Sequence, residues 1–71
     1  MCLADVYLTD RQQTGTDELV LADVAYIECE QDSVFISTLL GETKIVQAEI
    51  RAVDFMKNTV TLRTKDNGNN G

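Results

Sequence analysis

The chemistry available to this sequence is concentrated at its first two residues, Met1 and Cys2. Methionine aminopeptidases remove Met1 when residue 2 is small, so we expect the mature chain to begin at Cys2. The new terminus then carries an α-amine and a thiol on adjacent carbons, which close a five-membered chelate ring on one metal ion. Their reference pKa values, near ~8 and ~8.5, allow both groups to lose a proton when a metal binds. Cys2 is therefore a candidate metal ligand.

The sequence contains one other cysteine, Cys29. Two cysteines without a CxxC motif exclude a four-cysteine zinc ribbon within one chain. Strand alternation places Cys29 on one face with Ala25 and Ile27, so we expect a small buried thiol there. A disulfide between Cys2 and Cys29 is disfavoured in a reducing cytosol. In the alternative interpretation, Cys29 supplies a further thiolate to the metal.

A dimer axis passing near the first strand would bring two copies of Cys2 together. Two amines and two thiolates then form an N2S2 set, which suits planar Ni(II), although Cu(II) favours a similar geometry and Zn(II) a tetrahedral one. The backbone nitrogen of Leu3 could also enter the coordination sphere, and these ligand sets remain open alternatives. Three acidic residues could add oxygens, but oxygen suits harder ions than Ni(II), and we interpret them as surface charges. They are Asp5, Glu28 and Glu30.

Histidine is absent from the sequence. Its absence removes the commonest general base and excludes Ser–His and Cys–His nucleophile pairs. The four glycines do not form a phosphate-binding loop. We therefore do not expect an enzyme.

The sequence has 12 acidic and 6 basic residues, for a formal net charge of −6. Eight of the acids lie within residues 1–36 beside a single base, so the first half offers no basic face for phosphates. The four aromatic residues are too scattered to stack on nucleic-acid bases, and we expect them in the core or an interface. They are Tyr7, Tyr26, Phe35 and Phe55. A nucleic-acid partner is therefore not expected.

No apolar run approaches the roughly 20 residues of a membrane helix, and no signal peptide precedes the first strand. We expect a cytoplasmic protein that has no membrane partner. A domain this small buries only about 60% of the surface of its unfolded chain, so self-association is a natural way to gain stability.

Alternating apolar and polar residues predict strands along most of the sequence. The expected strands cover residues 2–8, 19–21, 24–30, 34–40, 53–55 and 59–63, with Val60 and Leu62 facing inward. Residues 42–53 form either one long bent strand or a strand followed by a helical turn at 48–52. We expect a loop at 10–17, a bend at Asp23, a hairpin turn at 31–33, and a turn at 57–58 that Asp54 caps. Five to seven short strands predict an all-β domain over residues 1–64, either a small barrel or a curled antiparallel sheet, followed by a disordered tail at 65–71.

Four short motifs, in this order, resemble the CooT family of small nickel-binding proteins, which are associated with carbon monoxide dehydrogenase maturation. They are Cys2–Leu8, Asp23-Val24, Leu39–Glu42 and Ile50–Phe55. The resemblance covers nearly all of the chain except residues 10–18 and the tail after Lys65. It implies an Sm-like, SH3-like small β-barrel that forms a homodimer and binds Ni(II) through Cys2.

The chelate chemistry and the resemblance together predict a cytoplasmic nickel metallochaperone, a homodimer that holds Ni(II) between two copies of Cys2. Its expected client is a nickel enzyme such as carbon monoxide dehydrogenase. The acidic loop Thr14–Glu18 and Cys29 depart from the family, which leaves open whether Cys29 binds metal. The alternative function is an Sm-like RNA-binding or scaffolding module, although a shared fold is weak evidence for function. A third is a redox-sensitive dimer linked through Cys2.

Overall fold

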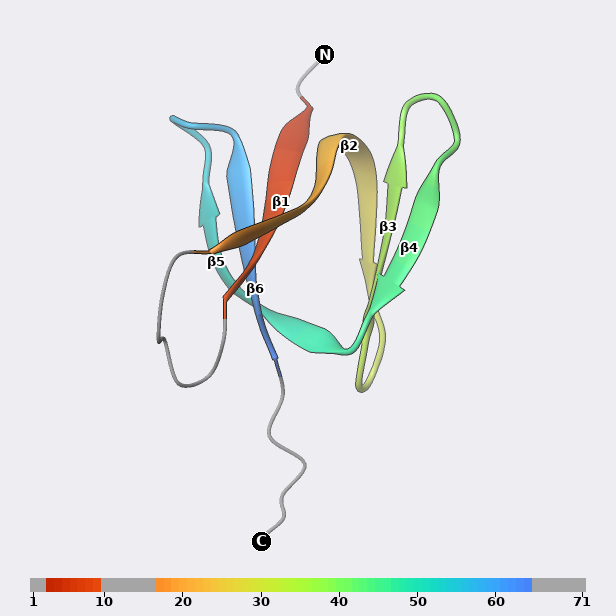
Figure 1. The fold of residues 1–71 in the computed structure, drawn as a ribbon, viewed down its shortest axis with the longest axis vertical. Coiled ribbons are helices and arrows are strands. Elements are labelled where there is room, and N and C mark those ends of the chain that lie inside the picture. The colour runs from red at the N-terminus through yellow and green to blue at the C-terminus, as the bar shows by residue number, and fades with distance from the viewer. Residues whose placement is uncertain (1–2, 10–16, 65–71) are drawn as a thin grey trace, which may run out of the picture.

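The computed structural model describes residues 3–9 and 17–64, which form six strands in a single sheet (Figure 1). The strands are β1 (Ala4–Thr9), β2 (Glu18–Cys29), β3 (Val34–Thr38), β4 (Thr43–Val46), β5 (Ala48–Asp54) and β6 (Thr59–Thr64). These residues include no helix, and hence none that could cross a membrane. The all-β prediction is confirmed. Cys2, residues 10–16 of the expected loop and the expected tail at 65–71 lie outside the described residues.

The strand order β4-β3-β2-β1-β6-β5 places β4 and β5 at opposite edges of the sheet. These two edge strands are nevertheless joined through a single residue, Gln47. So short a connection requires the sheet to curl until its edges approach each other, and Figure 1 shows this curl. Of the two predicted forms, the curled sheet is confirmed, whereas the strands do not close into a barrel. The single long bent strand expected over residues 42–53 corresponds to β4 and β5, and the helical turn expected at 48–52 is wrong, because β5 covers these residues.

One pair of neighbouring strands departs from the antiparallel sheet that we predicted. Strands β1 and β6 pair in parallel, with Val6 opposite Val60 and Leu8 opposite Leu62. The chain reverses direction between β2 and β3 and again between β3 and β4, but between β4 and β5 it only bends. The turn after β5 then reverses it once more. Because the chain does not reverse between β4 and β5, β6 runs in the same direction as β1. The other four pairings are antiparallel.

Extra residues in β2 and β5 bend the sheet. Ala4 pairs with Val24 and Val6 pairs with Leu21, so Asp5 faces two residues of β2. Further register shifts lie between Val24 and Tyr26 in β2, and between Ile50 and Ala52 in β5. Bulges of this kind increase the local twist and bend the strand that carries the extra residue. The bend that we expected at Asp23 is present within β2, where Asp23 has φ 58°.

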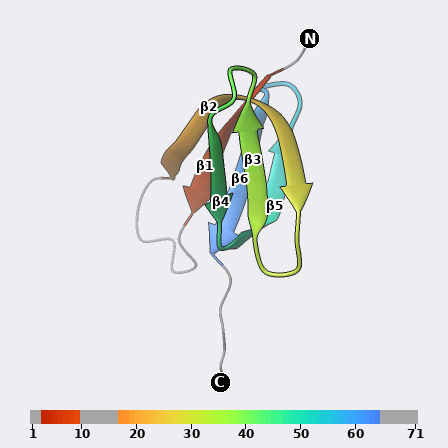
Figure 2. The same cartoon turned by 90° about the vertical axis from the view of Figure 1, so that its right-hand side faces the viewer.

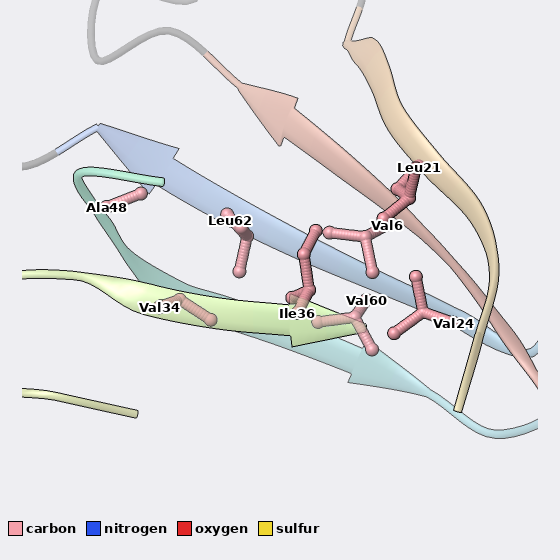
Figure 3. Close-up of a cluster of buried hydrophobic side chains, with 8 residues drawn as sticks. All are labelled: Val6, Leu21, Val24, Val34, Ile36, Ala48, Val60 and Leu62. Atoms are coloured by element: carbon pink, nitrogen blue, oxygen red, sulfur yellow. The ribbon is translucent and has the colours of Figure 1, made fainter. Parts of the chain in front are cut away.

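The core lies within the curl, where hydrophobic side chains from five strands meet (Figure 3). It comprises Val6, Leu21, Val24, Val34, Ile36, Ala48, Val60 and Leu62. Each large side chain removed from water contributes about 1.5–3 kcal/mol. The inward orientation predicted for Val60 and Leu62 is confirmed.

Candidate functional site

Three segments meet at the end of the sheet where β1 begins. Figures 1 and 2 both place the start of β1 at the same end as the β3–β4 turn and the β5–β6 turn, with β1 between them in Figure 1. Leu3 precedes β1 directly and is covalently joined to Cys2, so the candidate ligand is attached to the chain at this end of the sheet. We call this end the rim and define it by Leu3, Leu39, Leu40, Phe55 and Met56.

The rim exposes large apolar side chains at the tips of both turns. Leu40 is 96% exposed and Leu39 57% exposed in the β3–β4 turn, and Phe55 is 85% and Met56 95% exposed in the β5–β6 turn. Turn tips usually carry Gly, Asn, Asp, Ser or Pro, because those residues favour the backbone geometry or bond to it. The geometry of neither turn requires the large apolar side chains that these tips carry. A concentration of exposed apolar residues is typical of a contact surface.

Two hollows flank Leu3, which lines both of them. The smaller, of about 190 Å³, lies towards the β5–β6 turn and is lined in part by Val24, Val53 and Phe55. The larger, of about 430 Å³, lies towards the β3–β4 turn. Its walls are Leu3, Ala22, Asp23, Thr38, Leu39, Leu40 and Glu42. The start of β1 therefore separates two recesses of different size and charge.

Asp54 holds the β5–β6 turn in place. Its Oδ1 accepts hydrogen bonds from the backbone N–H groups of Met56 at 2.9 Å and Lys57 at 3.1 Å. Asn58 closes the turn with φ 57°, and its carbonyl oxygen accepts a hydrogen bond from the N–H of Asp5 at 3.0 Å. The capping role predicted for Asp54 is confirmed. These bonds tie the Phe55–Lys57 tip to the start of β1.

The β3–β4 turn is held by Thr38. Its hydroxyl oxygen accepts a hydrogen bond from the N–H of Glu42 at 3.0 Å, and its backbone carbonyl accepts one from Gly41 at 3.1 Å. Gly41 has φ 101°, a conformation that side-chain-bearing residues rarely adopt. The two leucines are thereby presented at a tight, defined tip.

The three carboxylates considered as oxygen ligands do not gather. Asp5 Oδ1 accepts a hydrogen bond from the backbone N–H of Asp23, which is a structural role at the bulge. Glu28 Oε1 accepts one from the hydroxyl of Tyr26 at 3.2 Å. Glu30 is exposed beside the hairpin that follows β2. Within residues 3–9 and 17–64, no three Cys, Asp or Glu side chains form a group that could hold a metal ion.

Cys29 is exposed, so the buried thiol that we predicted is wrong. It is the last residue of β2, next to the exposed hairpin at residues 30–32. The predicted assignment of β2 side chains to two faces is also wrong, because the register shift after Val24 brings both Val24 and Ile27 against the core. Strict alternation would separate these two residues. The end of β2 and the start of β1 lie at opposite ends of the sheet (Figure 1).

The aromatic residues do not form the buried core. Tyr26 and Phe35 make an edge-to-face contact with ring centroids 6.2 Å apart, at the surface of β2 and β3. Tyr7 is only partly buried, and Phe55 belongs to the rim. Of the two roles expected for these residues, the core role is wrong. The sequence patterns did not identify the rim leucines or Met56 as a surface, although pairs of large apolar residues in the two turns, just before Gly41 and Lys57, were the available signal.

Two of the three comparisons with known proteins found a match. The family model of the CO dehydrogenase accessory protein CooT matches residues 1–63. A crystal structure of a protein assigned as CooT from Carboxydothermus hydrogenoformans has a TM-score of 0.78 and 18% sequence identity, covering 92% of this chain and 100% of that one. At this identity the structural likeness speaks for the fold alone. No curated protein matches the sequence. Because the family model spans almost the whole sequence, this chain belongs to the CooT family of CO dehydrogenase accessory proteins.

Proposed function

We propose that this protein is a cytoplasmic nickel metallochaperone for carbon monoxide dehydrogenase. It binds Ni(II) through the α-amine and thiolate of Cys2 in a homodimer, and it passes the ion on during maturation of the enzyme. The observation that carries the proposal is the match to a CO dehydrogenase accessory family over residues 1–63, a range that begins with Met1-Cys2.

The donor chemistry supports a site at the terminus. Removal of Met1 leaves an amine and a thiol that chelate one ion, and both groups deprotonate readily when they bind it. The described residues contain no competing group of metal ligands, and Cys29 is carried by the far end of β2. Nitrogen and thiolate donors in a four-coordinate set suit Ni(II).

The position of the terminus supports transfer of the ion. Leu3, which follows Cys2 directly in the sequence, lies at the rim of the fold and outside the core. A bidentate ligand at an open end can be replaced one donor atom at a time by the ligands of a client site.

The proposal is tested by titrating the reduced, Met1-processed protein with Ni(II) and following ultraviolet-visible absorption. Thiolate-to-nickel charge-transfer bands that saturate at one ion per two chains are the expected result. Saturation at one ion per chain would contradict the shared site. The absence of these bands would contradict nickel binding and would favour an RNA-binding or scaffolding role.

Two variants assign the ligand. Cys2→Ser should abolish the bands without altering the fold, whereas Cys29→Ser should leave the titration unchanged, because Cys29 lies at the other end of the sheet. Residues added ahead of Cys2 convert its amine into an amide and should weaken binding while keeping the thiol. Full nickel affinity in Cys2→Ser would overturn the assignment.

A further inference from the structure

The rim carries a protruding tip and a recess on opposite sides of Leu3. The tip consists of Phe55, Met56 and Lys57, which lie in the exposed β5–β6 turn. The recess is the hollow of about 430 Å³ beside the β3–β4 turn, a volume within the range of roughly 300–1,000 Å³ that can enclose a bound group. Leu3 lines both the recess and the smaller hollow against which Phe55 lies.

The recess combines apolar walls with two negative charges. Leu39, Leu40 and Ala22 provide the apolar part, and Asp23 and Glu42 provide the carboxylates. In the described part of the chain, Arg63 and Glu49 form an ion pair, but Asp23 and Glu42 take part in none. The group that fits this recess has an apolar body and a positively charged end.

The tip has this chemistry. Phe55 and Met56 are apolar, and Lys57, the next residue, is a cation that forms no ion pair with any described residue. The hydrogen bonds from Met56 and Lys57 to Asp54 involve only backbone N–H groups, which leaves both side chains available. The chain therefore carries both halves of a complementary contact, and it cannot join them within one copy, because the start of β1 lies between the two turns (Figure 1).

We propose that the rim is a self-complementary interface, in which the Phe55–Lys57 tip of each copy enters the recess of a second copy. A twofold axis near Leu3 exchanges the two sides of the rim, so each tip faces the other copy's recess and the contact forms twice. Phe55 and Met56 cover Leu39 and Leu40, while Lys57 lies against Asp23 and Glu42. This inference specifies the homodimer of the proposed function and rests on it for the shared metal, because the same axis brings the two N-termini together.

A pair of charge reversals tests this contact between copies. Sedimentation equilibrium of the metal-free full chain, with chelator present, should show a dimer for the native protein. Lys57→Glu places a third carboxylate against Asp23 and Glu42, and Glu42→Lys places a second ammonium group against Lys57, so each variant alone should dimerise about tenfold or more weakly. Both altered side chains lie on the surface of turns, so neither change removes a bond that holds the fold.

Mixing the two variants is the decisive measurement. In the mixed dimer, the new carboxylate in the tip of the Lys57→Glu chain faces the new ammonium group in the recess of the Glu42→Lys chain. The second contact of the same dimer keeps its native pair, Lys57 against Glu42. The mixture should therefore form a heterodimer with nearly native affinity, which a structural effect inside one chain would not produce.

The apolar part of the contact has its own pair of variants. Met56→Ser should weaken the native dimer, because it removes an exposed apolar side chain from the tip. Ile45→Ser is the matched control, since Ile45 is an exposed apolar residue of β4 that does not line the recess, and it should leave the dimer unchanged. Equal weakening in both variants would contradict a contact confined to the rim.

The outcomes separate this inference from the proposed function. A chain that stays monomeric at all concentrations, or variants that do not recover on mixing, would overturn the interface. A chain that stays monomeric but still binds nickel through Cys2 would overturn the interface and leave the metal-binding role intact. Recovery on mixing in a protein that binds no nickel would support the interface and overturn the proposed function.

Discussion

The carboxylate of Asp5 accepts a hydrogen bond from the backbone N–H of Asp23 at 3.2 Å, across the bulge at which β2 bends. Asp23 adopts φ 58° there, a left-handed conformation that aspartate tolerates better than most residues. The backbone N–H of Asp5 is bonded to Asn58 in the β5–β6 turn. Asp5 thus connects the bend beside the recess with the turn that carries the tip.

Replacing Asp5 with Ala should lower the free energy of unfolding by about 1 kcal/mol, because the acceptor for the Asp23 N–H is lost. Asp5→Asn is the control, since its side-chain oxygen can still accept this bond, and its loss should be smaller. Urea denaturation checks both values. Equal losses in the two variants would contradict the role of the hydrogen bond.

Asp54→Ala removes the acceptor of two backbone hydrogen bonds in the β5–β6 turn. We expect a loss of about 1–2 kcal/mol in unfolding free energy and faster amide exchange at Met56 and Lys57. Asp54→Asn preserves the turn, because asparagine makes the same side-chain-to-backbone bonds. Unchanged exchange at these amides in the alanine variant would argue against this account.

Ile36 is completely buried in the core. Ile36→Val should cost about 0.5–1.5 kcal/mol, whereas Ile36→Ala should cost about 2–5 kcal/mol, because the larger deletion leaves a cavity. A domain of this size has little stability to lose, so the alanine variant should be close to unfolding under native conditions. Chemical denaturation of the two variants provides the comparison, and similar small losses would disprove the tight packing.

The negative charge of Glu28 raises the pKa of Tyr26 above its ordinary value of 10.0, and the hydrogen bond between the two side chains adds to this. Glu28→Gln should therefore move the titration of Tyr26 back towards 10.0. Since the raised pKa belongs to the folded state, the stability linked to Tyr26 is fully present below the ordinary pKa and is lost as the pH rises through the raised one. Phenolate absorbance in a Tyr7→Phe background follows Tyr26 alone, and an unchanged midpoint in Glu28→Gln would contradict the coupling.

Much of the fold follows from local patterns in the sequence. Alternating apolar and polar residues predicted strands over 34–40 and 59–63, which are β3 and β6 with slightly different ends, and the inward side chains of the second. The turn chemistry of Asp54 and Asn58 marked the β5–β6 hairpin. These features depend on residues close together in the chain, so the sequence alone can reveal them.

Alternation failed where a strand carries an extra residue. The shift between Val24 and Tyr26 changes which side chains face the core, so Ala25, which we grouped with Ile27, is exposed, whereas Val24 is buried. Bulges depend on how a strand meets its partner, and β2 has partners on both sides. The sequence of β2 alone does not contain this information.

The sequence by itself determined the chemistry of this protein: a cysteine behind the initiator methionine, no histidine, and an acidic first half. The tertiary structure decided what surrounds that chemistry. Leu3, Leu40 and Phe55 are far apart in the chain, and they share one end because the curled sheet brings two turns to either side of β1. Ligand chemistry belongs to individual side chains, whereas a surface is formed by segments that only long-range strand pairing brings together.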